Sequence, residues 1–223
     1  MKIKWGALVV DGSGKLGGHV ASKNKGGNYL RTKVTPANPQ TAEQSNVRSI
    51  FATISSGWSS LTESNRLSFA NKVGEYSQTN IFGDLKSPTA KALYQRLNQN
   101  LLLVGRPKLS VCPSPTAIPT ATFDAVVYVD GSSLSAEFLG SCTGSYVVIS
   151  ATPPMSAGTS FVKNKLRVVS TVQGDVDFGV NIMSDYVAKF GVIPVNSNIV
   201  FAVKFINANG QASPMQQVKL TFL

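Results

Sequence analysis

The chain has 223 residues, of which 43% are hydrophobic and 14% are charged, and its formal net charge is +10. This composition is typical of a folded globular protein and excludes an intrinsically disordered one. No run approaches about 18 consecutive apolar residues, so no membrane-spanning helix is predicted, and the first apolar run ends at Asp11, too early for a secretory signal.

The excess positive charge is confined to the first half of the chain. Residues 1–110 carry 15 Lys and Arg against 5 Asp and Glu, whereas residues 111–223 carry 6 of each. Such an asymmetry favours a polyanionic partner or an acidic surface on a neighbouring subunit. A surface charge that serves only solubility is the alternative.

Residues 1–40 are predicted to be a basic, glycine-rich arm, extended or folded into a loose hairpin. Six glycines between residues 12 and 27 and the lack of apolar periodicity argue against a helix. We expect this arm to be ordered only against a neighbouring subunit and to contact acidic groups or phosphates. The expected contact residues are Lys15, His19, Lys23, Lys25, Tyr29, Arg31 and Lys33.

Residues 41–105 are predicted to be a helical segment. Thr41 with Gln44 is a capping signal for a first helix, Thr62 caps a second, and Pro88 marks the first turn of a third, which should stop at Gly105. Each helix is expected to bury one apolar face. The predicted inward residues are Val47, Ile50, Phe51, Ile54, Trp58 and Leu61, then Leu67, Ala70 and Val73, then Leu93, Tyr94, Leu97 and Leu101.

Residues 106–122 contain four prolines among Ser and Thr and are predicted to be a linker. Beyond them the apolar pattern changes to a period of two, and turn-forming pairs such as Gly174-Asp175 and Asn209-Gly210 separate the candidate strands. The predicted strands are 125–129, 133–139, 146–151, 165–171, 177–182, 199–206 and 217–222.

Seven short strands in about 100 residues are typical of an immunoglobulin-like sandwich. The predicted fold class is therefore α+β: a basic extended arm and a helical segment, followed by an all-β immunoglobulin-like sandwich over residues 123–223. A closed barrel is the alternative. Four aromatic residues are expected in the sandwich core: Tyr186, Phe190, Phe201 and Phe205.

Few residues suit catalysis, a cofactor or a metal. Gly12, Gly14 and Gly17 have the dinucleotide-binding spacing, but Gly26-Gly27 would interrupt the required helix and residues 32–42 contain no acid for the ribose. Acidic residues are scattered, so neither a metal site nor a cofactor site is predicted.

Catalytic groups are equally sparse. The only histidine, His19, lies in the arm, where no apolar scaffold would hold it beside a catalytic partner. Asp175 and Asp177 are either a glycosidase pair or a solvated loop, and the loop is favoured. Cys112 and Cys142 either pair or, as their sparseness favours, remain two buried thiols. We therefore expect no enzyme.

A family resemblance covers residues 1–105. Residues 14–41 read GKLGGHVASKNKGGNYLRTKVTPANPQT, and Gln44, Arg48, Trp58, Leu61-Thr62 and Ile81-Phe82-Gly83-Asp84 follow in order. This order resembles small structural proteins of tailed bacteriophages and prophages. In the second half, Tyr186, Phe190-Gly191 and Pro194, then Ile206-Asn207 and residues 210–214, resemble fibronectin type III or immunoglobulin-like modules.

The resemblance implies a virion structural protein: an accessory or decoration subunit of the head, or a neck or tail component, assembling through its N-terminal arm. Its implied partners are other virion subunits, as a homo-oligomer or as capsid, neck or tail neighbours, with non-specific nucleic acid contact and no membrane. One alternative is a nucleic-acid-binding protein that uses the basic half and releases its ligand at high salt. Another is a carbohydrate-binding adhesin that uses the β domain.

Overall fold

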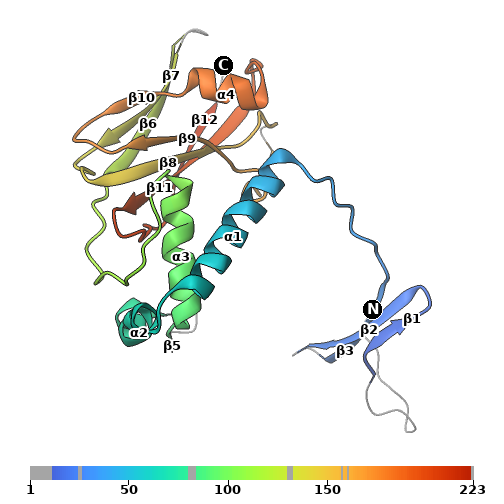
Figure 1. Cartoon of the computed structure of the whole chain (residues 1–223). Coiled ribbons are helices and arrows are strands. Elements are labelled where there is room, and N and C mark those ends of the chain that lie inside the picture. The colour runs from blue at the N-terminus through green and yellow to red at the C-terminus, as the bar shows by residue number, and fades with distance from the viewer. Residues whose placement is uncertain are drawn as a thin grey trace. The chain divides into compact units, whose positions relative to one another are not determined.

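The computed structural model describes residues 12–24, 27–79, 84–129, 133–156, 158–159 and 161–221 (Figure 1). The chain divides into two compact units, residues 1–45 and 46–223. Helices and antiparallel sheets are both present, so the predicted α+β class is confirmed. Within the described residues, no helix combines the length and the apolar character that crossing a membrane requires.

The N-terminal unit contains a three-stranded antiparallel sheet. Its strands β1 (Gly14–Leu16), β2 (His19–Asn24) and β3 (Gly27–Thr32) pair in chain order. Gly17, in the turn between β1 and β2, has a φ of 57°, which glycine adopts without steric penalty. The segment predicted as an extended arm or loose hairpin is therefore a more regular structure, because its glycines end strands rather than interrupt them.

The predicted helical segment consists of α1 (Ala42–Ser60), α2 (Glu63–Lys72), the 3-10 helix η1 (Val73–Tyr76) and α3 (Ala90–Leu103). Two short strands, β4 (Gln78–Thr79) and β5 (Leu85–Lys86), pair between η1 and α3. Thr41 and Thr62 cap α1 and α2 as predicted, since their hydroxyls accept the backbone N–H of Gln44 and Asn65, each at 3.3 Å. Thr89, next to Pro88, caps α3.

The end of α3 is a Schellman motif. Gly105 has a φ of 72°, and its N–H donates to the carbonyl of Leu102 at 3.2 Å. The N–H of Arg106 donates to the carbonyl of Leu101 at 2.8 Å. The predicted stop at Gly105 is therefore confirmed.

The helices share a small core around three aromatic rings. Trp58, Phe69 and Tyr94 lie with ring centroids 5.3 to 6.1 Å apart. The predicted inward face of α3 is confirmed, because Leu93, Tyr94, Leu97 and Leu101 are buried.

The predicted inward faces of α1 and α2 are partly wrong. Val47 is 54% exposed, because only the part of α1 from Ile50 onward packs against the helical core. Phe51 lies within that part but does not belong to the core, and it is 51% exposed. Leu67 is 52% exposed and Ala70 is exposed as well. The larger Phe69 is buried in their place, since it meets both Trp58 and Tyr94 edge-on or nearly so.

The predicted linker, residues 106–122, is a docked strap rather than a free tether. It contains no helix and no strand before Thr122. Lys72 Nζ donates to the Cys112 carbonyl and Tyr76 Oη to the Pro113 carbonyl, each at 3.0 Å. Prolines prevent regular structure because they lack an N–H, but the carbonyls around them remain acceptors. The strap therefore joins the helices and the β domain within one compact unit.

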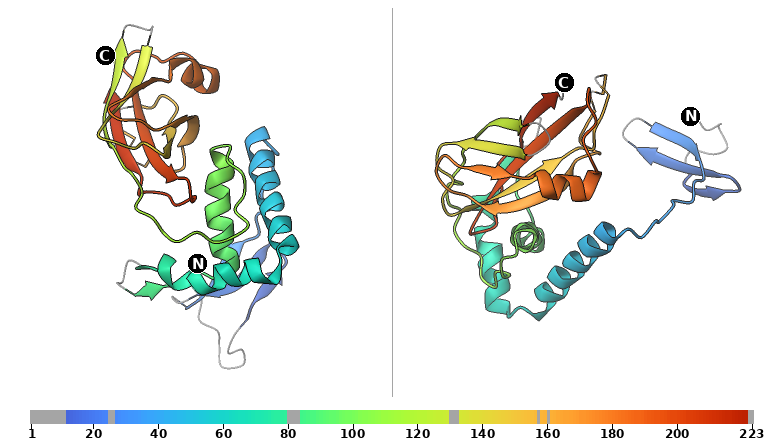
Figure 2. Two further views of the ribbon diagram at one scale, coloured as in Figure 1. Left: turned by 60° about the vertical axis from the view of Figure 1, so that its left-hand side comes forward. Right: turned by 90° about the horizontal axis from the view of Figure 1, so that it is seen from above.

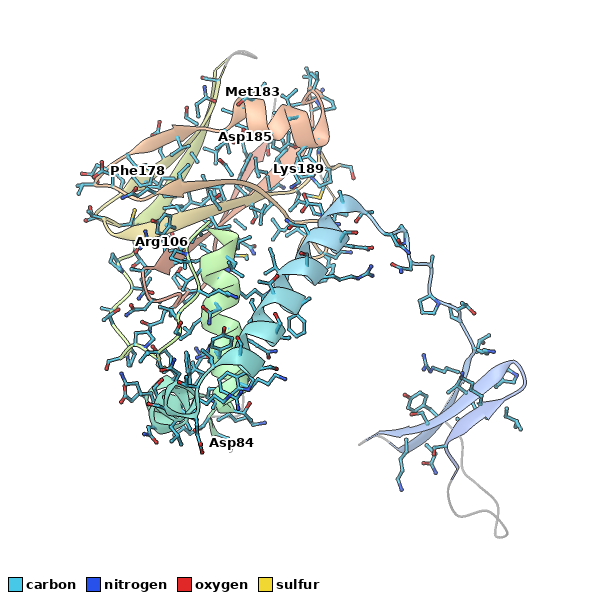
Figure 3. All side chains as sticks on the ribbon, viewed as in Figure 1. Asp84, Arg106, Phe178, Met183, Asp185 and Lys189 are labelled. Carbon is cyan, nitrogen blue, oxygen red and sulfur yellow. The ribbon has the colours of Figure 1, made fainter. Side chains whose placement is uncertain are left out.

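The strap's first residue also contacts the β domain. The guanidinium carbon of Arg106, labelled in Figure 3, lies 5.8 Å from the centroid of the Tyr146 ring, a cation–π distance. Figure 2 shows the helices gathered at one end of the β strands.

All seven predicted strands of the β domain are present. They are β6 (Thr122–Val129), β7 (Ser133–Leu139), β8 (Ser145–Ala151), β9 (Arg167–Gln173), β10 (Gly179–Asn181), β11 (Asn198–Asn207) and β12 (Gln216–Thr221). One antiparallel sheet has the order β10-β7-β6 and the other β12-β11-β8-β9. Side chains from both sheets form one hydrophobic core.

One helix of the β domain, α4 (Met183–Phe190), is not predicted from the sequence. It lies in the chain between β10 and β11. The expected core aromatics are confirmed, since Tyr186, Phe201 and Phe205 are fully buried and Phe190 packs against the same core. The hydroxyl of Tyr186 donates to the Thr152 carbonyl at 3.0 Å, which satisfies its buried oxygen.

The two cysteines are unpaired and buried in different clusters, Cys112 with the helices and Cys142 in the β domain. The sequence left open a disulfide or two separate thiols, and the structure has two separate thiols. Burial raises the pKa of both thiols. They are therefore packing residues rather than reactive groups.

Candidate assembly surface on the basic arm

The register of the three arm strands decides which predicted contact residues share a face. Lys15 of β1 pairs with Val20 of β2, and Val20 pairs with Arg31 of β3. Directly opposed residues in an antiparallel sheet point to the same side. Lys15 and Arg31 therefore lie on one face, with Tyr29 two residues before Arg31 on the same strand and face.

The other face of the arm carries a different set. Leu16 pairs with His19, and His19 pairs with Thr32. Lys23, four residues after His19 on β2, shares this second face. Five of the seven predicted contact residues are thus divided between two sides of a sheet, because successive side chains of a strand alternate. Lys25 lies outside the described residues.

The last predicted contact residue, Lys33, follows the end of β3. Its backbone N–H donates to the carbonyl of Gly18 at 2.8 Å, so it remains attached to the sheet. Its side chain is exposed, as are those of Lys15, His19, Lys23 and Arg31, whereas Tyr29 is half-buried. The contact role of these residues stays a prediction.

The arm buries almost nothing within its described residues. Ala21, 9% exposed, is the only hydrophobic residue of the described arm that counts as buried, and Leu16 and Val34 are each 72% exposed. A sheet of three strands needs an apolar face packed against something to be stable on its own. Packing within the described arm therefore contributes little to the stability of the sheet.

The glycine spacing near the N-terminus does not form a nucleotide site. Gly14 begins β1 and Gly17 lies in the turn to β2, so no helix follows this glycine-rich stretch. A dinucleotide site requires a helix N-terminus that faces the pyrophosphate. In the described residues, strand β2 stands where this motif requires a helix.

The acidic residues considered as a glycosidase pair hold loops. Asp175 Oδ1 accepts the N–H of Val176 at 2.9 Å, and Asp177 Oδ1 accepts the N–H of Gly140 at 2.6 Å. Within the described part of the chain, no group of three or more His, Cys, Asp or Glu side chains is placed to hold a metal ion. These carboxylates have structural partners, which favours the loop interpretation.

A cavity of about 230 Å³ lies where the helices meet the β domain. Its lining includes Tyr76, Arg96, Asn100 and Gln211. The amides are already engaged: Asn100 Nδ2 donates to the Gly210 carbonyl at 2.8 Å, and Gln211 Oε1 accepts the N–H of Thr116 at 2.9 Å. Because these groups stabilise the junction, the cavity is better explained as a structural seam than as a substrate site.

Lys204 supports the same junction. Its Nζ donates to Asn100 Oδ1 at 3.3 Å, and burial lowers the pKa of its ammonium group. A half-buried lysine held by an amide alone loses part of its hydration. This residue therefore ties β11 to α3 rather than serving a ligand.

A second candidate surface, which was not predicted from the sequence, lies on the β domain. Asp124, Glu137 and Asp177 line one groove of about 280 Å³, together with Leu139 and Phe178. Asp124 and Asp177 are 53 positions apart in the sequence, so only the sheet pairing brings them together. One feature of the sequence does point to this groove: in the alternating pattern of β7, Glu137 occupies an outward-facing position.

Comparison with models of protein families, with curated proteins and with solved structures finds no match for this chain.

Proposed function

We propose that the chain is a structural protein of a bacteriophage virion, an accessory or decoration subunit of the head or a component of the neck or tail. It assembles through its N-terminal arm. The observation that carries this proposal is the division of the chain into a basic, core-poor unit and a compact unit with two cores of its own. Arms of this kind gain their order from a neighbouring subunit.

The charge distribution supports a role for the arm in assembly. Residues 1–45 carry seven Lys and Arg against two Asp and Glu. Exposed cations on a sheet with little core of its own contribute little to folding, yet they strengthen and steer binding to an anionic surface.

We further propose that the β domain is a fibronectin type III or immunoglobulin-like module. The strand order β10-β7-β6 and β12-β11-β8-β9 supports this. In a constant-type immunoglobulin domain the fourth strand pairs beside the fifth, in the first sheet. Here the fourth strand, β9, pairs with β8 at the edge of the other sheet, which is the arrangement expected of a fibronectin type III module.

The test is mass spectrometry of purified particles of the phage that encodes the chain. We expect the chain in wild-type particles, and we expect particles from a phage that encodes the chain without residues 1–40 to lack it. Circular dichroism of the purified truncated chain checks that its compact unit is folded. Absence of the wild-type chain from particles would overturn the proposal.

The nucleic-acid alternative makes a different prediction. Retention of the purified chain on DNA-cellulose should then fall steeply as salt is raised, because each neutralised phosphate releases counterions. Retention that is weak and indifferent to salt would exclude this alternative and leave the assembly role.

A further inference from the structure

The outer face of the β10-β7-β6 sheet carries three carboxylates in one groove. Glu137 of β7 pairs with Ala125 of β6 on one side and with Gly179 of β10 on the other. Asp124 is the extra residue of the β-bulge in β6, where the register shifts between Phe123 and Ala125. The bulge thus brings the Asp124 carboxylate into the groove beside Glu137.

The third carboxylate comes from the segment that leads into β10. The N–H of Asp177 donates to the Gly140 carbonyl at 3.3 Å, and the N–H of Gly140 donates back to Asp177 Oδ1. Asp177 is therefore fixed beside the end of β7. Asp124 and Asp177 lie on opposite sides of β7, with Glu137 between them on the central strand.

These carboxylates are available for a partner. The carboxylates of Asp124 and Glu137 are exposed and form no hydrogen bond or ion pair with any described residue. The Asp177 carboxylate uses one oxygen to accept the N–H of Gly140. The basic residues of the β domain lie elsewhere, on or beside the other sheet and on α4. They are Lys163, Lys165, Arg167, Lys189, Lys204 and Lys219. The sandwich is neutral overall but has one acidic face.

The first face of the arm is complementary in charge to this groove. Lys15 and Arg31 flank Val20 on the two outer strands of the arm, so their positions are about 10 Å apart at roughly 4.8 Å per strand. Asp124 and Asp177 lie on opposite sides of β7, Asp124 beside Glu137 and Asp177 beside Gly140 at the end of the strand. The half-buried Tyr29 on this arm face has apolar counterparts in Leu139 and Phe178, which is labelled in Figure 3.

We propose that the basic arm of one copy binds the acidic outer face of the β10-β7-β6 sheet of a second copy. This rests on the proposed assembly role of the arm and names its partner. The contact is heterologous, because the arm and the groove are different surfaces of the chain, so it leads from each copy to the next. Rows or rings of copies are the expected products.

The test is sedimentation velocity of the full-length chain at low and high salt. We expect the wild-type chain to self-associate at about 50 mM salt and to dissociate as salt screens the contact. The arm variant Lys15→Glu/Arg31→Glu and the groove variant Asp124→Lys/Glu137→Lys should each raise the dissociation constant by about tenfold or more. Mixing the two variants should restore association, since each then supplies the partner of the other.

Two single charge reversals, each with half the charge change of the arm variant, serve as controls. Lys91→Glu lies on α3 and Lys219→Glu lies on β12 of the other sheet; both should associate like the wild type. Equal loss in these variants would show that net charge, not this contact, drives association.

Three outcomes would overturn the inference: a monomeric wild-type chain, a groove variant that associates normally, or reversed variants that do not rescue each other. If the chain is monomeric and binds duplex DNA through Lys15 and Arg31, the partner of the arm is nucleic acid and not a second copy. If the groove variant still enters particles and arm deletion prevents entry, the inference fails while the proposed function stands.

Discussion

The backbone N–H of Leu109 donates to the side-chain Oδ1 of Asn98 at 2.6 Å. Asn98 is fully buried on α3, and its Nδ2 donates to the Tyr94 carbonyl at 3.0 Å. One amide thus links the helix to the strap that follows it. The strap owes its docked position to this buried polar group rather than to any regular structure of its own.

Asn98→Ala should destabilise the compact unit by about 2–3 kcal/mol, because it leaves the N–H of Leu109 without a partner and opens a small void. Urea unfolding followed by tryptophan fluorescence measures the change. The control is Gln99→Ala, since Gln99 is the exposed neighbour on the same helix. A loss no larger than that of the control would contradict the role assigned to Asn98.

Gly210→Ala should be more damaging than Gly144→Ala, another glycine substitution in the β domain. Gly210 has a φ of 77°, and a Cβ placed there would overlap the backbone carbonyl of Leu97 on α3. Gly144 also has a positive φ, of 80°, but a Cβ there would meet nothing within 4 Å. We expect Gly144→Ala to cost about 1–2 kcal/mol of backbone strain and Gly210→Ala clearly more. Thermal unfolding of both variants gives the comparison, and equal losses would disprove the close approach of the loop to α3.

The sequence predicted local structure well where periodicity and capping agree. The seven strands and the caps of α1 and α2 follow from alternation, turn pairs and Thr hydroxyls. The exposed Val47 and Leu67 could not be foreseen, because helical spacing identifies an apolar face but not how much of it a neighbour covers. The docked strap was missed because its partners, such as Asn98 and Gln211, are specified by tertiary contacts.

The candidate site was only partly predictable for a related reason. The arm residues were identified by charge and glycine content, yet their division between two faces depends on the register of β2 against both neighbours. The acidic groove depends on a β-bulge at Asp124, which no sequence pattern marked. Sequence therefore gives the composition of a surface, while strand pairing decides which charges stand together.

The compact unit should lose stability in alkali. Burial raises the pKa of the Tyr76 hydroxyl to about 12 and raises the pKa values of Tyr94, Tyr186 and the two thiols. The folded state therefore keeps protons that the unfolded state has lost. The stability that these groups contribute is fully present below the unfolded pKa values of about 9 and 10, and it is lost as pH rises through the folded values.

Urea unfolding at a series of pH values from neutral to strongly alkaline measures this loss. Tyr186→Phe should be less stable at neutral pH by about 1 kcal/mol, because the Thr152 carbonyl loses its donor. The same variant should lose less stability than the wild type as pH rises. Tyr29→Phe, in the other unit, is the control and should follow the wild type. A Tyr186→Phe profile parallel to that of the wild type would refute this assignment.

The arm should be weakly protected from hydrogen exchange in a monomer and strongly protected in an assembly. Ordering a residue costs about 1–2 kcal/mol of backbone entropy, and glycine loses the most. The described arm buries only Ala21 among its hydrophobic residues, so its packing does not offset that cost. We expect the amides of β2 and β3 to exchange rapidly in dilute chain verified as monomeric, while those of Ile149 and Phe205 in the β-domain core stay protected. In purified particles or associated chain the arm amides should slow, and the core amides should not change. Strong protection of the arm in the monomer would show that the sheet is stable by itself, and the argument that a partner completes it would fall.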